Sequence, residues 1–231
     1  MTVRSETSDT FMARKTKEDA EATRSSILDA AELCFLKKGV ARTTLDDIAA
    51  QAGHTRGAVY WHFANKLEVF EAVMERVESP FISQLDQIAS SNSDRPLETL
   101  RQFHITVFDE LTHNSHTRNA VEISYLHCEL AEETRPILSR EQRGATQFNE
   151  RMKEAFAHAK RLKQLRADLD PSICAMTLRC AISGLIREWL LNPQLISLER
   201  DGLALVDTLL SSFATDPSAA PRTNTARKQR A

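Results

Sequence analysis

The stretch from Thr43 to Lys66 reads TTLDDIAAQAGHTRGAVYWHFANK and determines how the rest of the chain is interpreted. Thr44 stands where a helix N-cap is needed, and the Asp47 carboxylate can reach back to the Thr44 amide, as in a capping box. Gly53 follows where a helix can end in the left-handed conformation, which glycine adopts without steric cost. Thr55 can then cap a second short helix. The stretch therefore predicts two short helices joined by a tight turn.

The second of these helices has the composition of a nucleic-acid interface. It spans roughly residues 56 to 63 and combines small residues with long hydrogen-bonding ones. Small residues let a helix backbone approach another surface closely, and two short helices joined in this way are typical of the helix-turn-helix, whose second helix enters the major groove. The residues expected to contact DNA are Arg42, Thr44, Thr55, Arg56, Gly57, Tyr60, Trp61, His62 and Lys66.

These residues are expected to divide the work of binding. Arg56 is the expected base-edge contact, because a guanidinium can bind guanine through two hydrogen bonds. Mainly phosphate-positioning roles are expected for Thr44, Thr55, Tyr60, His62 and Lys66. Lys66 follows Asn65, which can cap the next helix, so that free amides and an ammonium would face the same phosphate. Tyr60 and Trp61 would also fit as core aromatics of a small bundle, and the sequence leaves this alternative open.

The composition indicates an α-helical protein. The 231 residues include only six glycines and seven prolines, and 42% of the residues are hydrophobic. The alternation of apolar and polar residues that is typical of β-strands is scarce. The net charge of −2 gives the chain no overall attraction for DNA, so binding must depend on a local basic surface. The sequence shows neither a signal peptide nor an apolar run of about 18 residues, which predicts a cytoplasmic protein that does not enter membranes.

The cysteines and histidines indicate neither a metal site nor a catalytic centre. The four cysteines, Cys34, Cys128, Cys174 and Cys180, show no CxxC spacing, so buried thiols are expected, and nothing favours the alternative of a redox-sensing pair. The seven histidines form neither an HxxxH nor an HExxH pattern. No Ser/His/Asp, paired-carboxylate or phosphate-loop pattern supports catalysis. We therefore expect no enzyme activity, no cofactor and no metal.

Helical periodicity continues through the chain and predicts about nine helices in all. Besides the two short helices, the expected ones span about residues 17–38, 67–88, 95–112, 117–128, 135–164, 171–191 and 197–213. In the segment 67–88 the apolar residues stay on one helical face on both sides of Pro80, which favours one kinked helix over two separate helices. The segment 171–191 is apolar on more than one face and must be covered on more than one side. The last two helices are expected to form a two-fold interface, with an intramolecular core as the alternative.

These residues resemble a known family. Ile27 to Lys66, with Tyr60-Trp61-His62-Phe63 and Asn65-Lys66, is similar to the DNA-binding domain of TetR-family repressors. A likeness to the AcrR/TtgR-type branch, which controls multidrug efflux pumps, is carried by the segments ARKTKE (13–18), GVARTT (39–44) and TRGAVYWHF (55–63). Weaker similarity continues to about Phe213. The resemblance implies an all-α fold with an N-terminal three-helix helix-turn-helix domain and a C-terminal helical domain for ligand binding and dimerisation.

Pattern and resemblance together divide the chain into four parts. Residues 1–11 are expected to be a disordered extension, 12–66 the helix-turn-helix domain, 67–214 the ligand-binding and dimerisation domain, and 215–231 a disordered basic tail. Met12-Ala13-Arg14-Lys15 resembles the usual beginning of such chains, which leaves Met1 and Met12 as alternative translation starts.

In this family, helices four to eight enclose a ligand cavity and the last two helices form the dimer. Carried over position by position, the resemblance places in this cavity Phe81, Phe103, Val107, Val121, Tyr125, Phe148, Met152, Arg179, Ile182, Ser183 and Ile186. Such a lining suits a hydrophobic or aromatic inducer bound with loose specificity, because methionine repacks and aromatic rings stack. Val121 and Ser183 depart from the branch pattern, where an asparagine and an acidic residue are usual, so the ligand preference does not carry over.

The resemblance thus implies a homodimeric, ligand-responsive repressor of a multidrug efflux operon, linked to antibiotic resistance, that binds a palindromic double-stranded operator. Ligand binding is expected to change the separation of the two recognition helices through the fourth helix and so to release DNA. Two alternatives stay open. One is a TetR-type repressor of catabolic or lipid genes with a narrow-specificity ligand. The other is a helical ligand-binding protein or enzyme in which the helix-turn-helix is only structural.

Overall fold

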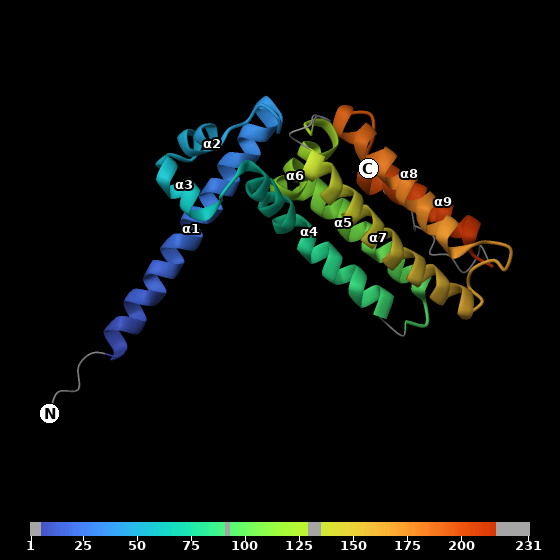
Figure 1. The fold of residues 1–231 in the computed structure, drawn as a ribbon. Helices are drawn as coiled ribbons and strands as arrows, with labels where there is room; N and C mark the ends of the chain where they lie inside the picture. The colour runs from blue at the N-terminus through green and yellow to red at the C-terminus, as the bar shows by residue number, and fades with distance from the viewer. Residues whose placement is uncertain (1–5, 91–92, 129–134, 216–231) are drawn as a thin grey trace, which may run out of the picture. The chain divides into compact units, whose positions relative to one another are not determined.

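The computed structural model describes residues 6–90, 93–128 and 135–215, and these residues are almost entirely helical (Figure 1). Within them there are nine α-helices, one short π-helical turn and a single isolated β-bridge between Leu165 and Ala214. This confirms the all-α class. The expected basic tail and the first five residues of the expected N-terminal extension lie outside the described residues.

The chain forms two compact units. The first comprises the residues up to Arg76 together with Asn119–Leu138, and the second comprises Val77–Arg118 and the residues from Ser139 onward. Helix α4 (Lys66–Ser90) passes without interruption from the first unit into the second, with Pro80 inside it (Figure 1). The apolar residues on both sides of this proline therefore belong to one continuous helix, as predicted.

The first unit is built around helix α1 (Glu6–Lys38), against which α2 (Leu45–Ala52) packs, followed by α3 (Arg56–His62). Ile27, Leu28 and Ala31 of α1 are buried, and the Phe35 ring meets the Phe70 ring of α4 edge-on with centroids 6.2 Å apart. Helix α1 begins at Glu6 rather than near residue 17, so the second half of the expected extension is helical. The extra turns have no apolar stripe that periodicity could detect.

Helix α6 (Ser115–Leu126) belongs largely to the first unit, although the sequence assigned it to the C-terminal domain. The backbone amide of Val40, just after α1, donates to the carbonyl of His127 at 3.0 Å. The Asn119 amide donates to the carboxylate of Glu32, which is only 2% exposed and lies 3.5 Å from the Arg76 guanidinium. Helices α1, α4 and α6 therefore meet at one buried carboxylate. Local sequence patterns cannot predict this contact, because it joins segments that are distant along the chain.

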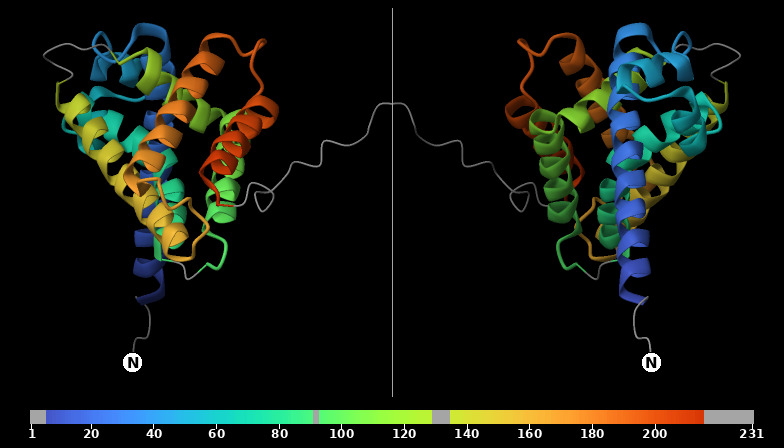
Figure 2. Two further views of the ribbon diagram at one scale, coloured as in Figure 1. Left: turned by 90° about the vertical axis from the view of Figure 1, so that its right-hand side faces the viewer. Right: turned by 90° about the vertical axis from the view of Figure 1, so that its left-hand side faces the viewer.

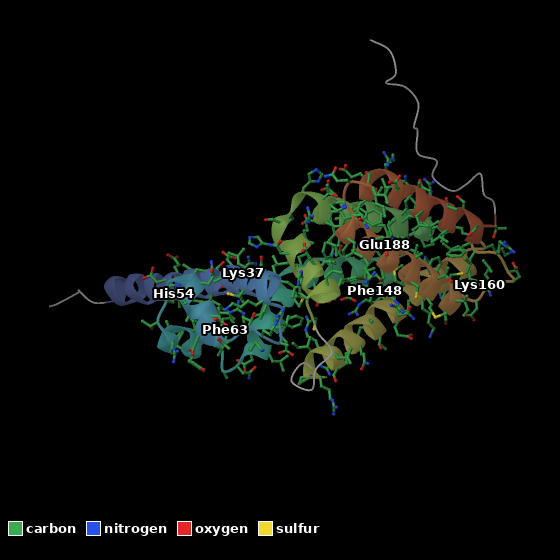
Figure 3. The ribbon with its side chains drawn as sticks, turned by 90° about the horizontal axis from the view of Figure 1, so that it is seen from above. Lys37, His54, Phe63, Phe148, Lys160 and Glu188 are labelled. Atoms are coloured by element: carbon green, nitrogen blue, oxygen red, sulfur yellow. The ribbon has the colours of Figure 1, made fainter. Side chains whose placement is uncertain are left out.

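The second unit contains α5 (Pro96–His113), α7 (Arg135–Arg161), α8 (Pro171–Leu191) and α9 (Leu203–Phe213). Helix α9 packs against both α5 and α8, and Figure 2 shows α8 and α9 as neighbouring orange and red helices. The rings of Phe103 on α5 and Phe148 on α7 lie 6.2 Å apart, and Figure 3 shows Phe148 within this unit. Four helices thus share one apolar core.

The last predicted helix has an unexpected first turn. The π-helical turn η2 (Leu198–Gly202) precedes α9, and the Ser197 side chain caps it by accepting from the Arg200 amide. A Cβ atom added at Gly202 would lie 2.8 Å from the Phe108 ring of α5. Only glycine therefore permits this close approach of η2 to α5.

Candidate DNA-binding surface and ligand-binding helices

Helices α2 and α3 form a helix-turn-helix whose caps are those that the sequence predicts. The Thr44 hydroxyl accepts from the Asp47 amide at 3.1 Å, and the Asp47 carboxylate accepts from the Thr44 amide at 3.0 Å, which completes the capping box. Gly53 has a φ of 69°, in the left-handed region. The Thr55 hydroxyl accepts from the Ala58 amide at 3.2 Å and so fixes the start of α3.

Asp47 also ties α2 to the end of α1. The Lys38 ammonium donates to the Asp47 carboxylate at 2.6 Å. This bond, together with those from Thr44, lowers the pKa of Asp47 to about 2. The carboxylate is therefore ionised and engaged within the protein, where it positions α2.

Helix α3 buries one side and exposes the other. Val59 and the cap residue Phe63 are buried, whereas Tyr60 is 56% exposed and Trp61 is 74% exposed. Arg56 and Gly57 at the start of the helix are exposed as well. The alternative that Tyr60 and Trp61 are core aromatics is therefore wrong for this chain. Their rings project from the helix that is expected to enter the major groove.

The small size of Gly57 serves no packing need of the protein itself. A Cβ atom added there would meet only the Thr55 hydroxyl oxygen, at an ordinary contact distance of 3.9 Å. Gly57 is also outside the left-handed region, since only Gly39 and Gly53 have positive φ among the described glycines. The fold would accept a side chain at this position, so its absence leaves the α3 surface open to a closely approaching partner.

His62 closes α3 as a neutral group. Its ring contacts the Trp61 ring edge-on, with centroids 4.6 Å apart. Partial burial and, to a smaller extent, the positive charge of Arg24 lower the pKa of His62. A neutral imidazole can still donate one hydrogen bond to a phosphate, but it adds no charge at pH 7.

Lys66 opens α4 and makes a contact within the protein. Its ammonium donates to the backbone carbonyl of Ala41 at 2.7 Å, which holds the loop before α2 against the first turn of α4. The Asn65 side chain accepts from the Glu68 amide at 3.0 Å and so caps α4 as predicted. Arg42, the next residue after Ala41, is exposed. The phosphate contact of Lys66 stays a prediction. Through its hydrogen bond to Ala41, Lys66 also helps to position the neighbouring Arg42.

Arg56 has a partner that the sequence did not indicate. Its guanidinium nitrogen Nη2 lies 2.7 Å from Oδ2 of Asp46 in the first turn of α2. The two residues are separated by the turn around Gly53, and only the angle between α2 and α3 brings them together. No sequence spacing predicts such a pair.

The eleven predicted ligand-binding residues are distributed over both units. Val121 and Tyr125 lie on α6 in the first unit, and the other nine lie on α4, α5, α7 and α8 in the second. Four of those nine are buried, namely Phe103, Met152, Ile182 and Ile186. The remaining five are partly exposed, namely Phe81, Val107, Phe148, Arg179 and Ser183. The second unit thus brings an apolar and aromatic set together on four helices.

Three buried polar atoms in the second unit lack hydrogen-bond partners among the described residues. They are Nε of Arg179 on α8, Oδ1 of Asn149 on α7 and Oε2 of Glu98 on α5. A buried polar atom without a partner costs about 1–3 kcal/mol, which a bound ligand or water can offset. The resemblance indicated Arg179. It did not indicate Asn149, for which the position next to Phe148 is the only signal.

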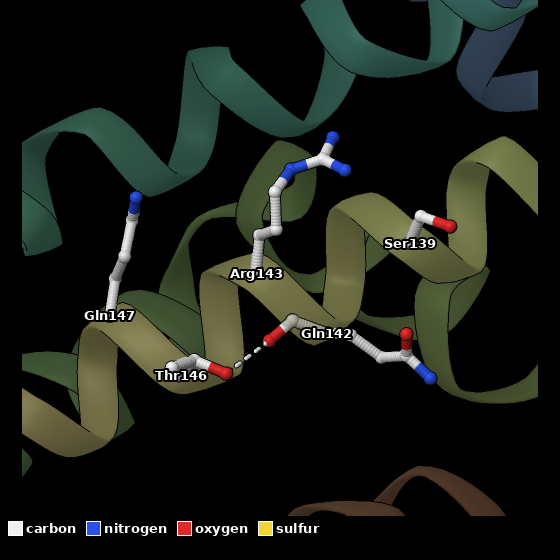
Figure 4. Close-up of a pocket in the computed structure, with 5 residues that line it drawn as sticks. All are labelled: Ser139, Gln142, Arg143, Thr146 and Gln147. Carbon is white, nitrogen blue, oxygen red and sulfur yellow. Dashed lines mark hydrogen bonds between the residues drawn. The ribbon is translucent and has the colours of Figure 1, made fainter.

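A polar pocket of about 520 Å³ lies on α7, lined by Ser139, Gln142, Arg143, Thr146 and Gln147 (Figure 4). The Thr146 hydroxyl donates to the Gln142 carbonyl at 2.8 Å, so that part of the lining is already hydrogen-bonded. None of the predicted ligand-binding residues contributes to this pocket.

Exposed apolar side chains follow one face of α8. Ile173, Met176 and Leu191 are 53%, 45% and 48% exposed, and Cys180 is exposed between them. Residues at these spacings lie above one another on a helix. The expectation of buried thiols is therefore wrong for Cys180, whereas Cys34 and Cys174 are buried and their pKa values are raised by that burial.

No described helix is long and apolar enough to cross a membrane. Comparison with known proteins shows that the chain matches two family models. Residues 27–73 match the model of bacterial regulatory proteins of the TetR family, and residues 95–215 match the C-terminal region of MAATS-type transcriptional repressors.

Individual relatives extend over nearly the whole chain. The HTH-type transcriptional regulator TtgR of Pseudomonas putida is 38% identical over 207 residues, which cover 90% of this chain and 99% of TtgR. The structure of SmeT, described as the repressor of the Stenotrophomonas maltophilia multidrug efflux pump SmeDEF, is 39% identical and covers 91% of this chain and all of that one, with a TM-score of 0.77. A complex of SmeT with triclosan is 40% identical over 90% of this chain and 100% of that one, with a TM-score of 0.81.

Proposed function

The chain belongs to the TetR family of bacterial regulatory proteins, and we propose that it is a ligand-responsive repressor of a multidrug efflux operon. The observation that carries the proposal is α3, a capped helix that exposes Arg56, Tyr60 and Trp61 and has an unfilled position at Gly57. The printed role of SmeT as a repressor of a multidrug efflux pump supports the choice of regulated genes. The protein would act in the cytoplasm, on chromosomal DNA.

On DNA, α3 enters the major groove with its N-terminus foremost. Arg56 binds a base edge, and Tyr60 and Trp61 pack along the backbone on either side of Gly57. Phosphates are held by the hydroxyls of Thr44 and Thr55, by His62 and by the charged groups of Arg42 and Lys66. The phosphate contacts determine the register of the protein on the duplex, and the base contact determines which DNA sequence is bound.

The protein acts as a homodimer through α8 and α9. Ile173 and Met176 expose apolar side chains in the first turns of α8 and Leu191 does so at its end, and exposed apolar patches mark protein–protein contact sites. A two-fold axis at this surface makes the interface self-complementary and presents two copies of α3. The operator is then a double-stranded palindrome, with half-sites one helical turn or a multiple of it apart.

The inducer is a hydrophobic or aromatic compound bound among the apolar residues of the second unit. Phe103 and Phe148 offer ring faces and Met152 an adaptable side chain. Arg179, with its buried and unpartnered Nε, offers a polar contact. The triclosan complex of SmeT supports an aromatic ligand.

Two helices can carry the signal from ligand to DNA. Helix α4 extends from Lys66 in the first unit to Phe81 and beyond in the second. Helix α6 carries Val121 and Tyr125, and it is hydrogen-bonded to the α1 region through Asn119 and through His127, the residue that follows the helix. A coupling free energy of about 1–3 kcal/mol through these helices would weaken DNA binding roughly 5- to 150-fold.

A mobility-shift assay tests this function directly. The purified protein is mixed with labelled DNA from upstream of its own gene, with and without triclosan and a panel of unrelated aromatic antibiotics, flavonoids and biocides. A specific shift relieved by several unrelated ligands supports an efflux repressor. Relief by one acyl ligand class alone favours a narrow-specificity regulator of catabolic or lipid genes. Failure to select any specific fragment from genomic DNA would exclude a repressor.

A further inference from the structure

The ion pair between Asp46 and Arg56 joins the two helices of the DNA-reading motif. Oδ2 of Asp46 and Nη2 of Arg56 are 2.7 Å apart, and their side chains are 43% and 73% exposed. Arg56 is the first residue of α3, and Asp46 is the second residue of α2. The base-reading arginine is therefore paired with a carboxylate in the DNA-free protein.

The local electrostatics make Asp46 the carboxylate that matters to Arg56. A cation at a helix N-terminus faces the positive end of the helix dipole, and the first turn of α3 contains no acidic residue. Asp46 supplies the negative charge from α2, where it also faces a favourable helix N-terminus. The neighbouring Asp47 is already engaged by Lys38 and the α2 cap.

We propose that Asp46 is a positioning residue that restrains Arg56 in the DNA-free protein and so lowers its availability to DNA. A phosphate binds a guanidinium through an ion pair of the same kind, so non-specific binding must replace the Asp46 carboxylate with a phosphate. A guanine offers two well-placed acceptors in the major groove, and this bidentate contact also replaces the ion pair. Because the pair is lost in both complexes, Asp46 weakens binding to random-sequence DNA and to the operator alike.

The size of the effect follows from the exposure of the pair. Exposed ion pairs are weak, so Arg56 can leave Asp46 readily when the operator is present. We expect Asp46→Asn to tighten binding to a random-sequence duplex about two- to five-fold, the range that corresponds to a weak exposed pair. The salt dependence of that binding should steepen by about one unit, because one more cation becomes free to bind a phosphate.

The experiment measures fluorescence anisotropy on a random-sequence duplex at several salt concentrations, and on the operator where one has been selected. Four variants accompany the wild type: Asp46→Asn, Arg56→Ala, the double variant, and Asp46→Glu. A fifth, Glu75→Gln, removes the same charge from an exposed position on α4 in the same unit. Thermal unfolding of each variant shows that it is folded.

The proposal requires that Asp46→Asn tightens binding to random-sequence DNA about two- to five-fold, and binding to a selected operator by at least as much. It also requires that Arg56→Ala abolishes the effect and that Asp46→Glu, which can still reach the guanidinium, restores wild-type values. Unchanged non-specific binding in Asp46→Asn would overturn it. An equal effect in the Arg56→Ala background, or in Glu75→Gln, would overturn it too, since a general charge effect would then be responsible.

The inference deepens the proposed function of α3, but the two can fail separately. The arm on random-sequence DNA needs neither an operator nor a ligand. If no specific operator is found while Asp46→Asn acts through Arg56 on random DNA, the repressor function fails and the restraint of Arg56 stands. If an operator is found and Asp46→Asn has no effect on either DNA, the restraint fails and the repressor function stands.

Discussion

At the residue scale, the DNA-reading surface depends on side chains that are absent as well as on those that are present. Gly57 lies on α3 where a Cβ atom would have room within the protein. Arg56 and Trp61 on the same helix are exposed. The helix can therefore approach DNA closely at Gly57 while longer side chains on either side make contacts.

Replacing Gly57 with alanine should separate stability from DNA binding. Because glycine destabilises a helix by about 0.5–1 kcal/mol relative to alanine, we expect Gly57→Ala to leave the free energy of unfolding unchanged or raised by up to that amount. The added methyl group should weaken operator binding at least several-fold. Gly144→Ala is the matched control, since Gly144 is exposed on α7 with nothing within 4 Å of an added Cβ. Tight operator binding by Gly57→Ala would contradict a close approach at this position.

His104 on α5 makes the stability of the second unit depend on pH. Its imidazole is 2% exposed, Nδ1 lies 2.7 Å from the Leu100 carbonyl, and burial lowers its pKa to about 4. The unfolded chain, with an ordinary histidine pKa of about 6.5, binds a proton more readily than the folded one. Stability is therefore highest above about pH 6.5 and falls as the pH falls towards 4.

The expected loss between pH 7 and pH 5 is about 2 kcal/mol from His104 alone. Urea unfolding at the two pH values measures it, and a His104→Leu variant, which has no titrating group, should lose correspondingly less over the same interval. If the wild type and His104→Leu lose the same amount, His104 is not the group responsible.

At the scale of elements, a charged pair joins α5 to α9. Arg101 donates to Asp207 through two nitrogens, at 2.6 and 3.2 Å, and the side chains are only 11% and 15% exposed. Removing one partner leaves the other charge largely buried. We expect Arg101→Met to destabilise the protein by about 3 kcal/mol and a double variant, Arg101→Met with Asp207→Leu, to recover much of that loss.

Urea unfolding again provides the measurement, with Arg166→Met as the control. Arg166 pairs with Asp168 at 2.7 Å, but the side chains are 49% and 63% exposed, so its removal should cost less than about 1 kcal/mol. Similar losses for Arg101→Met and Arg166→Met would show that the α5–α9 pair contributes no more than a surface pair.

The exposed apolar side chains of α8 yield a separate expectation about assembly. Ile173→Asp places a charge in the proposed dimer interface, while the exposed position should tolerate it in the monomer. Sedimentation velocity should show a shift from dimer to monomer with little change in the thermal midpoint. Leu162→Asp, at an exposed position just after α7, is the control and should stay dimeric. A dimeric Ile173→Asp variant would place the interface elsewhere.

The elements show which features of this fold a sequence can predict. Helix ends with local signals were predicted well, because Thr44 with Asp47, Gly53 and Thr55 act within a few residues of the chain. Features that depend on distant contacts were not. The close approach of Gly202 to Phe108 is one example, and the π-helical turn beside it has no local signal.

The candidate site divides in the same way. The exposed residues of α3 could be found from the sequence, since the motif that carries them is contiguous. The Asp46–Arg56 pair and the Lys66–Ala41 hydrogen bond could not be found in this way. Each joins residues that are distant along the chain and that meet only through the packing of the helices.

At the scale of the whole molecule, α4 is the helix that passes from the first unit into the second. It is continuous from Lys66 to Ser90, and within the first unit α6 is hydrogen-bonded to the buried Glu32 of α1. Because allosteric coupling is reciprocal, a ligand that weakens DNA binding must itself bind more weakly to the DNA complex, by the same factor.

The most direct measurement of a ligand-responsive repressor is therefore this reciprocity. Fluorescence anisotropy gives the dissociation constant for the selected operator with and without saturating triclosan, and calorimetry gives the dissociation constant for triclosan with and without operator. We expect both to weaken by one common factor, roughly between 5 and 150. If triclosan binds but leaves operator affinity unchanged, or if the protein binds operator and scrambled duplexes equally, the chain is not a repressor released by this ligand.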